Sequence, residues 1–260
     1  MKINDVYKLI DERAPFELSD IYCKQTDSYD NSGVIVDKKD DINGICFALD
    51  LSSRSVLYCV ENGCDLLITH HPAIFAPVKR VEGNVLQCAK NNIGVIACHL
   101  NLDFCKNGVD AAFAERLGAK KSSLLEKIGD GGYGRVFEVD QTLVEFKQNA
   151  EKAFNTVTFT FGDGNKRIKK VASFCGAGLD ERAIDSINAD LYCSADIKHH
   201  VLSYALDKGK AVMQFTHYAS EIYGIIDLYK HFSDLPIIKK QKIKICFFDD
   251  GAFRPLSEKE

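Results

Sequence analysis

Residues 65–75 read DLLITHHPAIF, an apolar run that ends on two adjacent histidines and a proline. The run does not alternate between apolar and polar residues, so we expect a strand that is covered on both faces, as in a parallel sheet. Pro72 restricts the residue before it to an extended or turn conformation, which ends the expected strand at the histidines. The stretch predicts an α/β fold in which polar side chains collect where a buried strand ends.

Strand-like and helix-like segments alternate on both sides of this stretch. A first series runs from SGVIVD (32–37) to GVDAAFAERLG (108–118), and a second runs from QTLVEFKQNAEKAF (141–154) to ASEIYGIIDLYKHF (219–232). The polar, glycine-rich segment 119–140 between them indicates a boundary or a crossover. The alternation predicts helices layered on largely parallel sheets.

The two series resemble each other. The segments VIACHLNLD (95–103) and VMQFTHYASE (212–221) both end an apolar strand on a histidine that is followed by a carboxylate four residues later. These pairs are His99 with Asp103 and His217 with Glu221. The matching order and spacing predict an internal duplication.

Composition and charge narrow the class of protein. The net charge is −4 and the isoelectric point about 6.0, which disfavours binding to nucleic acid or to an anionic membrane. The sequence shows neither a signal-peptide pattern nor an apolar run long enough to span a bilayer. The ten cysteines include no C-x-x-C pair, so we expect them to be reduced and mostly buried. These features predict a cytoplasmic protein.

Most of the seven histidines fall at or near the carboxyl ends of predicted strands, together with several carboxylates. The histidines are His70, His71, His99, His217 and, less closely, His199, and the carboxylates are Asp103, Asp196 and Glu221. Ligands bind beyond the carboxyl ends of strands in open α/β sheets. Imidazoles and carboxylates gathered in such a crevice predict a site for divalent metal.

The histidine doublet limits how metal could bind. Neighbouring side chains of an extended segment point in opposite directions, so His70 and His71 are not expected to share one ion in a regular strand. If the chain turns there, each could bind one of two ions. His217 and Glu221 lie four residues apart at an expected helix start and so share one face. A carboxylate can bridge two cations, which suits Asp103 or Glu221. Three imidazoles and two carboxylates therefore predict two ions of Zn, Mn, Fe, Co or Ni.

Simpler interpretations apply to other residues. A single histidine at a strand end is more often structural than a metal ligand. His231 lies late in a predicted helix, where the dipole favours it, and His199 and His200 lie inside a helix. The segment IGDGGYG (128–134) lacks the phosphate-loop pattern, and no G-x-S-x-G elbow is present. Cys98 is a conceivable nucleophile, but its strand context favours burial.

These motifs together resemble a known family. The sequences DLLITHHPAIF, HLNLDFCKNGVDAAFAERLG, SADIKHH and THYASE occur in the order found in the dinuclear-metal-centre family of GTP cyclohydrolase 1 type 2 homologues. The resemblance begins with YDNSGVIVD (29–37) and includes GDGGYGRVFE (129–138). Two positions differ: Tyr29 stands where the family usually has tryptophan, and Ser194-Ala195-Asp196 replaces Thr-Gly-Asp.

The resemblance implies an α/β fold of two intertwined α/β repeats, with mixed, largely parallel sheets flanked by helices. We expect residues 1–125 to form the first repeat, with 236–260 as a candidate addition to it. Residues 126–235 are expected to form the second, with no inserted middle domain. The family also implies assembly into a homohexameric ring.

The same resemblance implies which side chains hold two divalent metal ions. The ligands would be His70, His71, Asp103, His217 and Glu221, with the carboxylates bridging. His99 would line the site without being a ligand.

The predicted function is metal-dependent hydrolysis, in which metal-bound hydroxide attacks GTP or a related nucleotide or heterocycle. Asp196 and His99 are the predicted catalytic residues, because either could transfer the proton. The alternative is a metal-binding scaffold or regulator without turnover. A DNA-interacting ring is a weaker third possibility, which the acidic balance disfavours.

Overall fold

The structure, a computed structural model, describes residues 1–255. Residues 256–260, the end of the predicted C-terminal segment, lie outside the described residues. The chain divides into two compact units that interleave along the sequence. The first unit is made of residues 1–108, 128–131 and 224–251. The second is made of residues 109–127, 132–223 and 252–255.

The first unit is built on a five-stranded sheet in the order β1-β4-β3-β2-β11. Strands β2, β3, β4 and β11 run parallel, and β1 pairs with β4 in the antiparallel sense. Its helices and strands are α1 (Ile3–Arg13), α2 (Glu17–Thr26), β1 (Gly33–Val36), β2 (Gly44–Ala48), α3 (Ser53–Glu61), β3 (Leu66–Thr69), α4 (Gly83–Lys90), β4 (Gly94–Ala97), α5 (Leu100–Phe104), α11 (Pro236–Lys240) and β11 (Lys244–Phe247).

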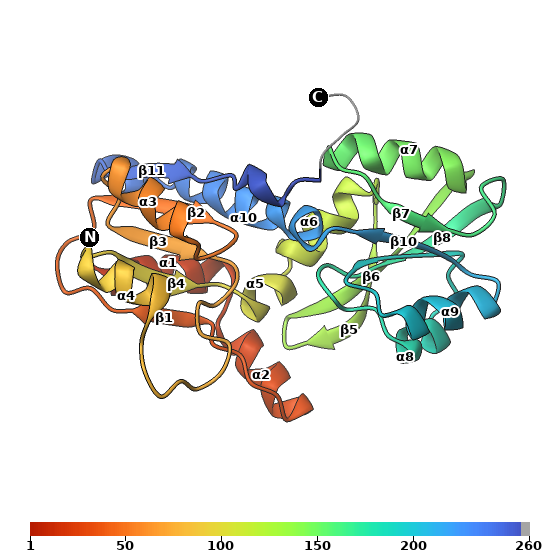
Figure 1. Cartoon of the computed structure of the whole chain (residues 1–260), viewed down its shortest axis with the longest axis horizontal. Coiled ribbons are helices and arrows are strands. Elements are labelled where there is room, and N and C mark those ends of the chain that lie inside the picture. The colour runs from red at the N-terminus through yellow and green to blue at the C-terminus, as the bar shows by residue number, and fades with distance from the viewer. Residues whose placement is uncertain (256–260) are drawn as a thin grey trace. The chain divides into compact units, whose positions relative to one another are not determined.

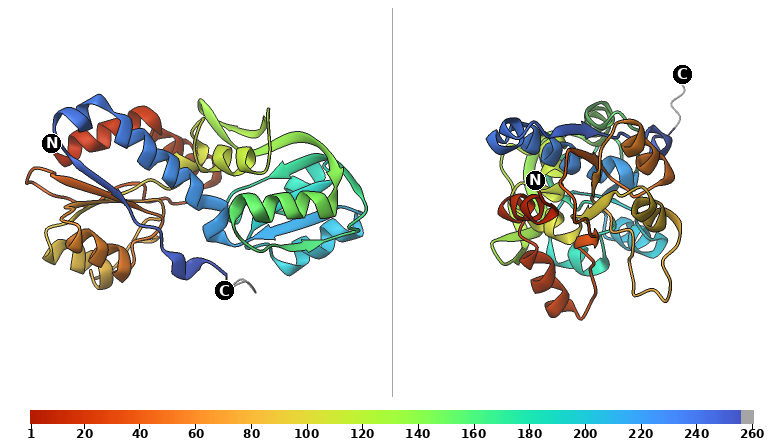
Figure 2. Two further views of the ribbon diagram at one scale, coloured as in Figure 1. Left: turned by 90° about the horizontal axis from the view of Figure 1, so that it is seen from above. Right: turned by 90° about the vertical axis from the view of Figure 1, so that its left-hand side faces the viewer.

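Helices cover both faces of this sheet, as the red-to-yellow and dark-blue part of Figure 2 shows. Alternate residues of β2 point to opposite faces. Phe47 packs against Phe232 of α10 (His217–Asp234), with ring centroids 5.3 Å apart. Cys46 and Ala48 belong to the core under α3 and α4, which includes Cys59. All five residues of β2 are buried, so buried and exposed residues do not alternate along this strand, as the sequence predicted.

The second unit is built on a six-stranded sheet in the order β5-β6-β8-β9-β10-β7. Strands β8, β9 and β10 run parallel, and β6 and β7 pair with β8 and β10 in the antiparallel sense. Its elements are α6 (Val109–Arg116), β5 (Ser123–Ile128), β6 (Gly131–Thr142), α7 (Leu143–Phe154), β7 (Phe159–Phe161), β8 (Arg167–Ser173), α8 (Glu181–Ser186), β9 (Leu191–Ala195), α9 (His199–Asp207), β10 (Ala211–Phe215), the start of α10 and the 3-10 helix η1 (Gly251–Phe253).

Aromatic side chains fill the core of the second unit on both faces of its sheet. Tyr192 is fully buried and packs among residues of α8 and α9 on one face. Phe113, Phe154 and Phe215 join α6, α7 and β10, with ring centroids 5.0 to 5.4 Å apart. These contacts fix the carboxyl ends of β9 and β10, from which the candidate site residues of this unit project.

The two units repeat one arrangement, which Figure 1 allows the reader to follow by label. In the first, the chain order is β1, β2, α3, β3, α4, β4; in the second it is β7, β8, α8, β9, α9, β10. The first strand of each series lies antiparallel beside the last. The predicted fold class, two intertwined α/β repeats with mixed sheets flanked by helices, is confirmed. Helix α10 runs from one unit into the other.

Two local predictions were incomplete. Helix α2 was not foreseen, and residues 119–140, expected to form a boundary or a crossover, contain strand β5 and most of its sheet neighbour β6. Gly129 lies in the turn between the two strands, whereas Gly131 and Gly132 in β6 mark close approach to neighbouring backbone. A Cβ atom on Gly131 would lie 1.9 Å from the Phe104 carbonyl oxygen. Within residues 1–255, none of the helices combines the length and apolarity that crossing a membrane requires.

Candidate metal-binding clusters

The histidine doublet lies where the chain bends at the end of β3. The backbone N–H groups of His70 and His71 both donate to the carbonyl of Leu49, at 3.1 and 3.0 Å. The strand geometry that would send neighbouring side chains to opposite faces has therefore ended. The two imidazole rings lie on the same side, with centroids 4.9 Å apart.

His99 and Asp103 join the doublet from the end of the adjacent strand β4. The His99 ring lies 5.3 Å from that of His70 and 5.8 Å from that of His71. One ring nitrogen from each of the three histidines falls within 4.8 Å of the others. Asp103 lies one helical turn after His99 in α5, and its Oδ1 is 3.6 Å from His70 Nε2. The buried His70 and Asp103 side chains are 0% and 8% exposed.

In each of these three histidines, Nδ1 is held by an oxygen atom. His70 Nδ1 lies 2.7 Å from the carbonyl oxygen of Cys98, which can only accept a hydrogen bond. His71 Nδ1 lies 2.7 Å from Asp50 Oδ1, and His99 Nδ1 lies 2.6 Å from Asp30 Oδ1. Donation through Nδ1 leaves the lone pair of a neutral imidazole on Nε2, the form that binds metal.

The Asp30 carboxylate interacts strongly with His99 through a hydrogen bond and through its charge. Burial alone raises the pKa of Asp30, but hydrogen bonds from His99, Ser19 and Ser32 lower that pKa well below its usual range. Burial lowers the pKa of His99, yet the nearby Asp30 and Asp103 carboxylates raise it above its usual value. The cluster of the first unit is therefore an acidic environment that attracts positive charge.

The second unit carries a related cluster at the ends of β8, β9 and β10. His217 begins α10, two residues after the end of β10, and its Nδ1 lies 2.6 Å from Oδ2 of Asp196, which follows β9. Glu221 lies one turn further along α10, with Oε1 3.0 Å from His217 Nε2. The Glu221 side chain is 4% exposed. His217 is thus an imidazole held between two carboxylates.

Backbone geometry shapes the space around Glu221. Gly176, in the loop after β8, has a positive φ of 53°, and a Cβ atom there would lie 2.5 Å from Glu221 Oε1. The Gly176 N–H donates to Ser220 Oγ, and the Gly176 carbonyl accepts from Ser194 Oγ. A glycine at this position is required both by the backbone conformation and by the carboxylate beside it.

The donor atoms in each cluster fit a divalent ion. Two ligands bound at about 2.1 Å with an angle of 90° to 110° lie about 3.0 to 3.4 Å apart. The His217–Glu221 separation of 3.0 Å falls in this range, and the His70–Asp103 separation of 3.6 Å lies close to it. The donor types, imidazole nitrogen and carboxylate oxygen, are those that suit first-row transition metals.

The structure thus groups the sequence-predicted residues by unit. His70, His71, Asp103 and His99 lie together in the first, and His217, Glu221 and Asp196 lie together in the second. His199 and His200 lie in α9, and His200 forms an exposed pair with Glu181 at 3.3 Å. His231 lies late in α10, as predicted.

Three residues that shape these clusters were not identified from the sequence. Asp50 follows β2, so its position at a strand end was an available signal, but it lacks a histidine neighbour in sequence. Asp30 lies in the YDNSGVIVD motif, whose only signal in the sequence was the family resemblance. Gly176 follows β8 and gave no signal of its own.

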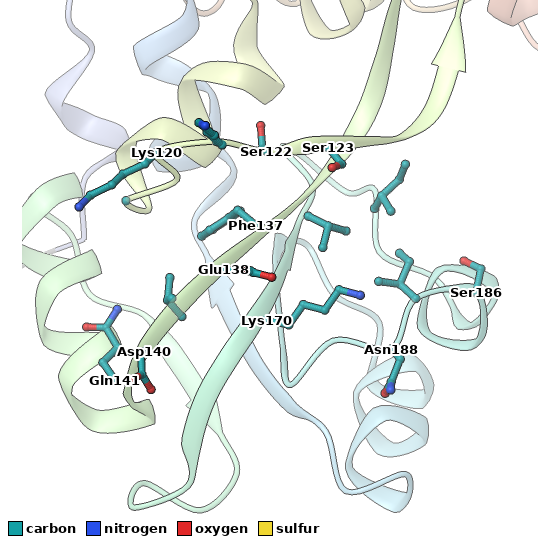
Figure 3. A pocket seen from close by; sticks show the side chains of 16 residues that line it. Lys120, Ser122, Ser123, Phe137, Glu138, Asp140, Gln141, Lys170, Ser186 and Asn188 are labelled. Carbon is teal, nitrogen blue, oxygen red and sulfur yellow. The ribbon is translucent and has the colours of Figure 1, made fainter.

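The second unit also contains an open pocket of about 1280 Å³, shown in Figure 3. It lies along β5, β6 and β8, and its lining includes Lys120, Ser123, Glu138, Lys170 and Asn188. None of the predicted site residues lines it. Its mixed charges and lack of histidine separate it from the metal-ligating clusters.

Fold and clusters together define a mixed α/β protein with histidine and carboxylate groups that could bind metal. Residues 1–251 match the family model Duf34/NIF3 (NGG1p interacting factor 3), and the chain belongs to this family. The resemblance seen in the sequence is thereby confirmed.

Relatives extend over most of the chain. The chain is 28% identical over 250 residues to a GTP cyclohydrolase 1 type 2 homolog of Clostridium acetobutylicum, covering 88% of this chain and 89% of the relative. It is 30% identical over 235 residues to a protein of the same name from Methanocaldococcus jannaschii, covering 86% and 92%. The crystal structure of Staphylococcus aureus protein SA1388 is similar in fold, with a TM-score of 0.82, 23% identity and coverage of 98% and 99%.

Proposed function

We propose that this chain binds two divalent metal ions and uses them in hydrolysis of GTP or a related nucleotide or heterocycle. The proposed ligands are His70, His71, Asp103, His217 and Glu221. The observation that carries the proposal is that each proposed histidine ligand has Nδ1 on an oxygen acceptor and so offers Nε2. Orientation of this kind is how proteins prepare imidazole for metal. The names of the relatives support the substrate class.

Two bound divalent ions would supply Lewis-acid polarisation and a water molecule of lowered pKa. The residues of the chain would position and tune that chemistry. His71 is held by Asp50 and His217 by Asp196, so these two carboxylates orient the proposed ligands. His99, whose pKa is raised beside buried Asp30, is suited to hold a proton next to the doublet.

The test of the proposal separates metal binding from turnover. Wild-type protein loaded with Mn, Fe, Zn or Co would be incubated with GTP, other nucleotides and a phosphodiester, and substrate loss followed by chromatography. We expect GTP or a related compound to be consumed with at least one metal. Absence of turnover with every metal, despite tight stoichiometric binding, would contradict hydrolysis and favour the scaffold or regulator instead.

Glu221→Gln keeps the shape of a proposed ligand while removing its charge, and we expect it to lose both metal content and turnover. Glu181→Gln is the matched control, because Glu181 also pairs with a histidine in the second unit but in an exposed position. The control should retain the metal content of the wild type. Unchanged metal stoichiometry in Glu221→Gln would refute the ligand assignment.

We also propose that the chain acts on a small-molecule substrate as a homohexamer in the cytoplasm. Exposed apolar side chains support self-association: Phe159, in the edge strand β7, is 65% exposed, and Val157 beside it is 46% exposed. Light scattering coupled to gel filtration would give a mass of about six chains. A monomeric mass at micromolar concentration would contradict the assembly.

A further inference from the structure

The first unit contains a group of thiols that is not part of the metal-binding clusters. Cys46 lies in β2, Cys246 in β11, and Cys64 just before β3. The Cys64 and Cys246 sulfur atoms are 3.1 Å apart, although the two residues are 182 positions apart in the chain. Cys46, Cys64 and Cys246 are in the thiol form in this structure.

Backbone contacts hold the two segments against the same strand. The Asp65 N–H donates to the Gly44 carbonyl at 3.0 Å, and the Lys244 N–H donates to the Asn43 carbonyl at 2.9 Å. A Cβ atom on Gly44 would lie 3.0 Å from Cys64 Cα and 3.4 Å from Cys64 Sγ. Because Gly44 has no side chain, the Cys64 side chain has room to approach the sulfur of Cys246 in β11.

We propose that Cys64 and Cys246 are a redox-active pair that forms a reversible disulfide when the protein meets a peroxide. A disulfide bond has a sulfur–sulfur length of about 2.0 Å, so the thiols must approach by about 1 Å. The movement is available because β11 is an edge strand, bonded to β2 on one side only within residues 1–255.

The two thiols differ in exposure and in charge environment. Cys246 is partly exposed, whereas Cys64 is buried. Hydrogen bonds from the thiols of Cys46 and Cys64 lower the pKa of Cys246, burial opposes the change, and the Lys244 charge adds to it. The Cys64 pKa is raised, mainly because this thiol donates to Cys246. Cys246 is thus the nucleophile and Cys64 the resolving thiol.

The reaction balances in two steps. The Cys246 thiolate attacks one oxygen of hydrogen peroxide, the O–O bond breaks, and sulfenic acid forms with release of hydroxide. The Cys64 sulfur then attacks the sulfenic sulfur, and water leaves as the S–S bond forms. Overall, two thiols lose two electrons and two protons, and one peroxide becomes two waters. A cellular thiol reductant restores the pair.

Peptide mapping tests the proposal on the wild-type chain. Reduced protein would be treated with a small excess of hydrogen peroxide, alkylated under denaturing conditions and digested with trypsin without reduction. We expect residues 55–79 and 245–259 to appear as one linked species, about 2 Da lighter than the two reduced peptides together. Because 55–79 contains both Cys59 and Cys64, fragment ions must assign the bond. Dithiothreitol should separate the peptides.

Variants assign the roles of the two thiols. In Cys64→Ser the linked species should vanish, and dimedone should label Cys246 as a persistent sulfenic acid. Cys88→Ser is the control, because Cys88 is buried in the same core but lies in α4, and it should leave the link intact. A bond from Cys246 to Cys46 or Cys59, or oxidation of the wild type without any link, would overturn the proposal.

Discussion

Removing the carboxylate that holds His217 should weaken metal binding without disturbing the fold. Asp196 Oδ2 lies 2.6 Å from His217 Nδ1, and the Asp196 side chain is 58% exposed. Its backbone has a positive φ of 46°, so alanine would add strain at this position. Asp196→Gly removes the side chain and tolerates that conformation, which makes it the cleaner perturbation.

The size of the effect follows from the contact. Loss of a group that orients a metal-ligating histidine typically costs about 10- to 100-fold in metal affinity, or about 1.4 to 2.7 kcal/mol. Because Asp196 is largely exposed, we expect Asp196→Gly to fall near the lower end. Asp196→Asn keeps an oxygen acceptor and loses only the charge, so its loss should be smaller, about threefold.

Competition with a chromophoric chelator would give the affinity of the metal-free protein for Zn²⁺ in the wild type and both variants. Thermal unfolding of the metal-free proteins would confirm that the fold is retained. The order of affinity should be wild type, then Asp196→Asn, then Asp196→Gly. An Asp196→Gly protein that is folded and binds Zn²⁺ within a factor of two of the wild type would refute this role of Asp196.

Three further predictions concern the first unit. Asp30→Asn should lower the pKa of His99 in an NMR titration of the metal-free protein. Since the folded-state pKa of Asp30 is depressed, its contribution to stability is present above about pH 4 and is lost as the pH falls, so the variant should show a shallower acid dependence than the wild type. Gly131→Ala, whose Cβ would meet the Phe104 carbonyl at 1.9 Å, should lose about 3 kcal/mol in urea unfolding, and wild-type stability would contradict that contact. Phe232→Ala, which empties a fully buried position, should lose about 3 to 5 kcal/mol, and a loss under 1 kcal/mol would contradict its role in the core.

The alternation of buried strands with helices was readable from sequence because it depends on local patterns. The stretch around His70 predicted a strand that ends on polar residues, and β3 ends at Thr69, one residue before His70. His217 and Glu221 were placed at a helix start by their spacing, and α10 begins there. Such features depend only on residues that are near in sequence, so a single sequence is enough to predict them.

Asp30 and Asp50, which orient His99 and His71, were not identified from the sequence for the opposite reason. Asp30 and His99 are 69 positions apart, and Asp50 and His71 are 21 apart, so each pair exists only after the strands have assembled. The bend that places the two histidine rings on one side likewise depends on a shared carbonyl, that of Leu49, which follows strand β2. Tertiary hydrogen bonding decides these features, and no local pattern encodes it.

Metal stoichiometry tests the central claim most directly. Elemental analysis would follow loading with a divalent metal and removal of the unbound ion by gel filtration. The wild type should contain two tightly held ions per chain. His71→Ala should retain at most one, because the doublet is proposed to divide between the two ions. A wild type that binds none, or a His71→Ala protein that still holds two, would contradict the proposed binuclear centre.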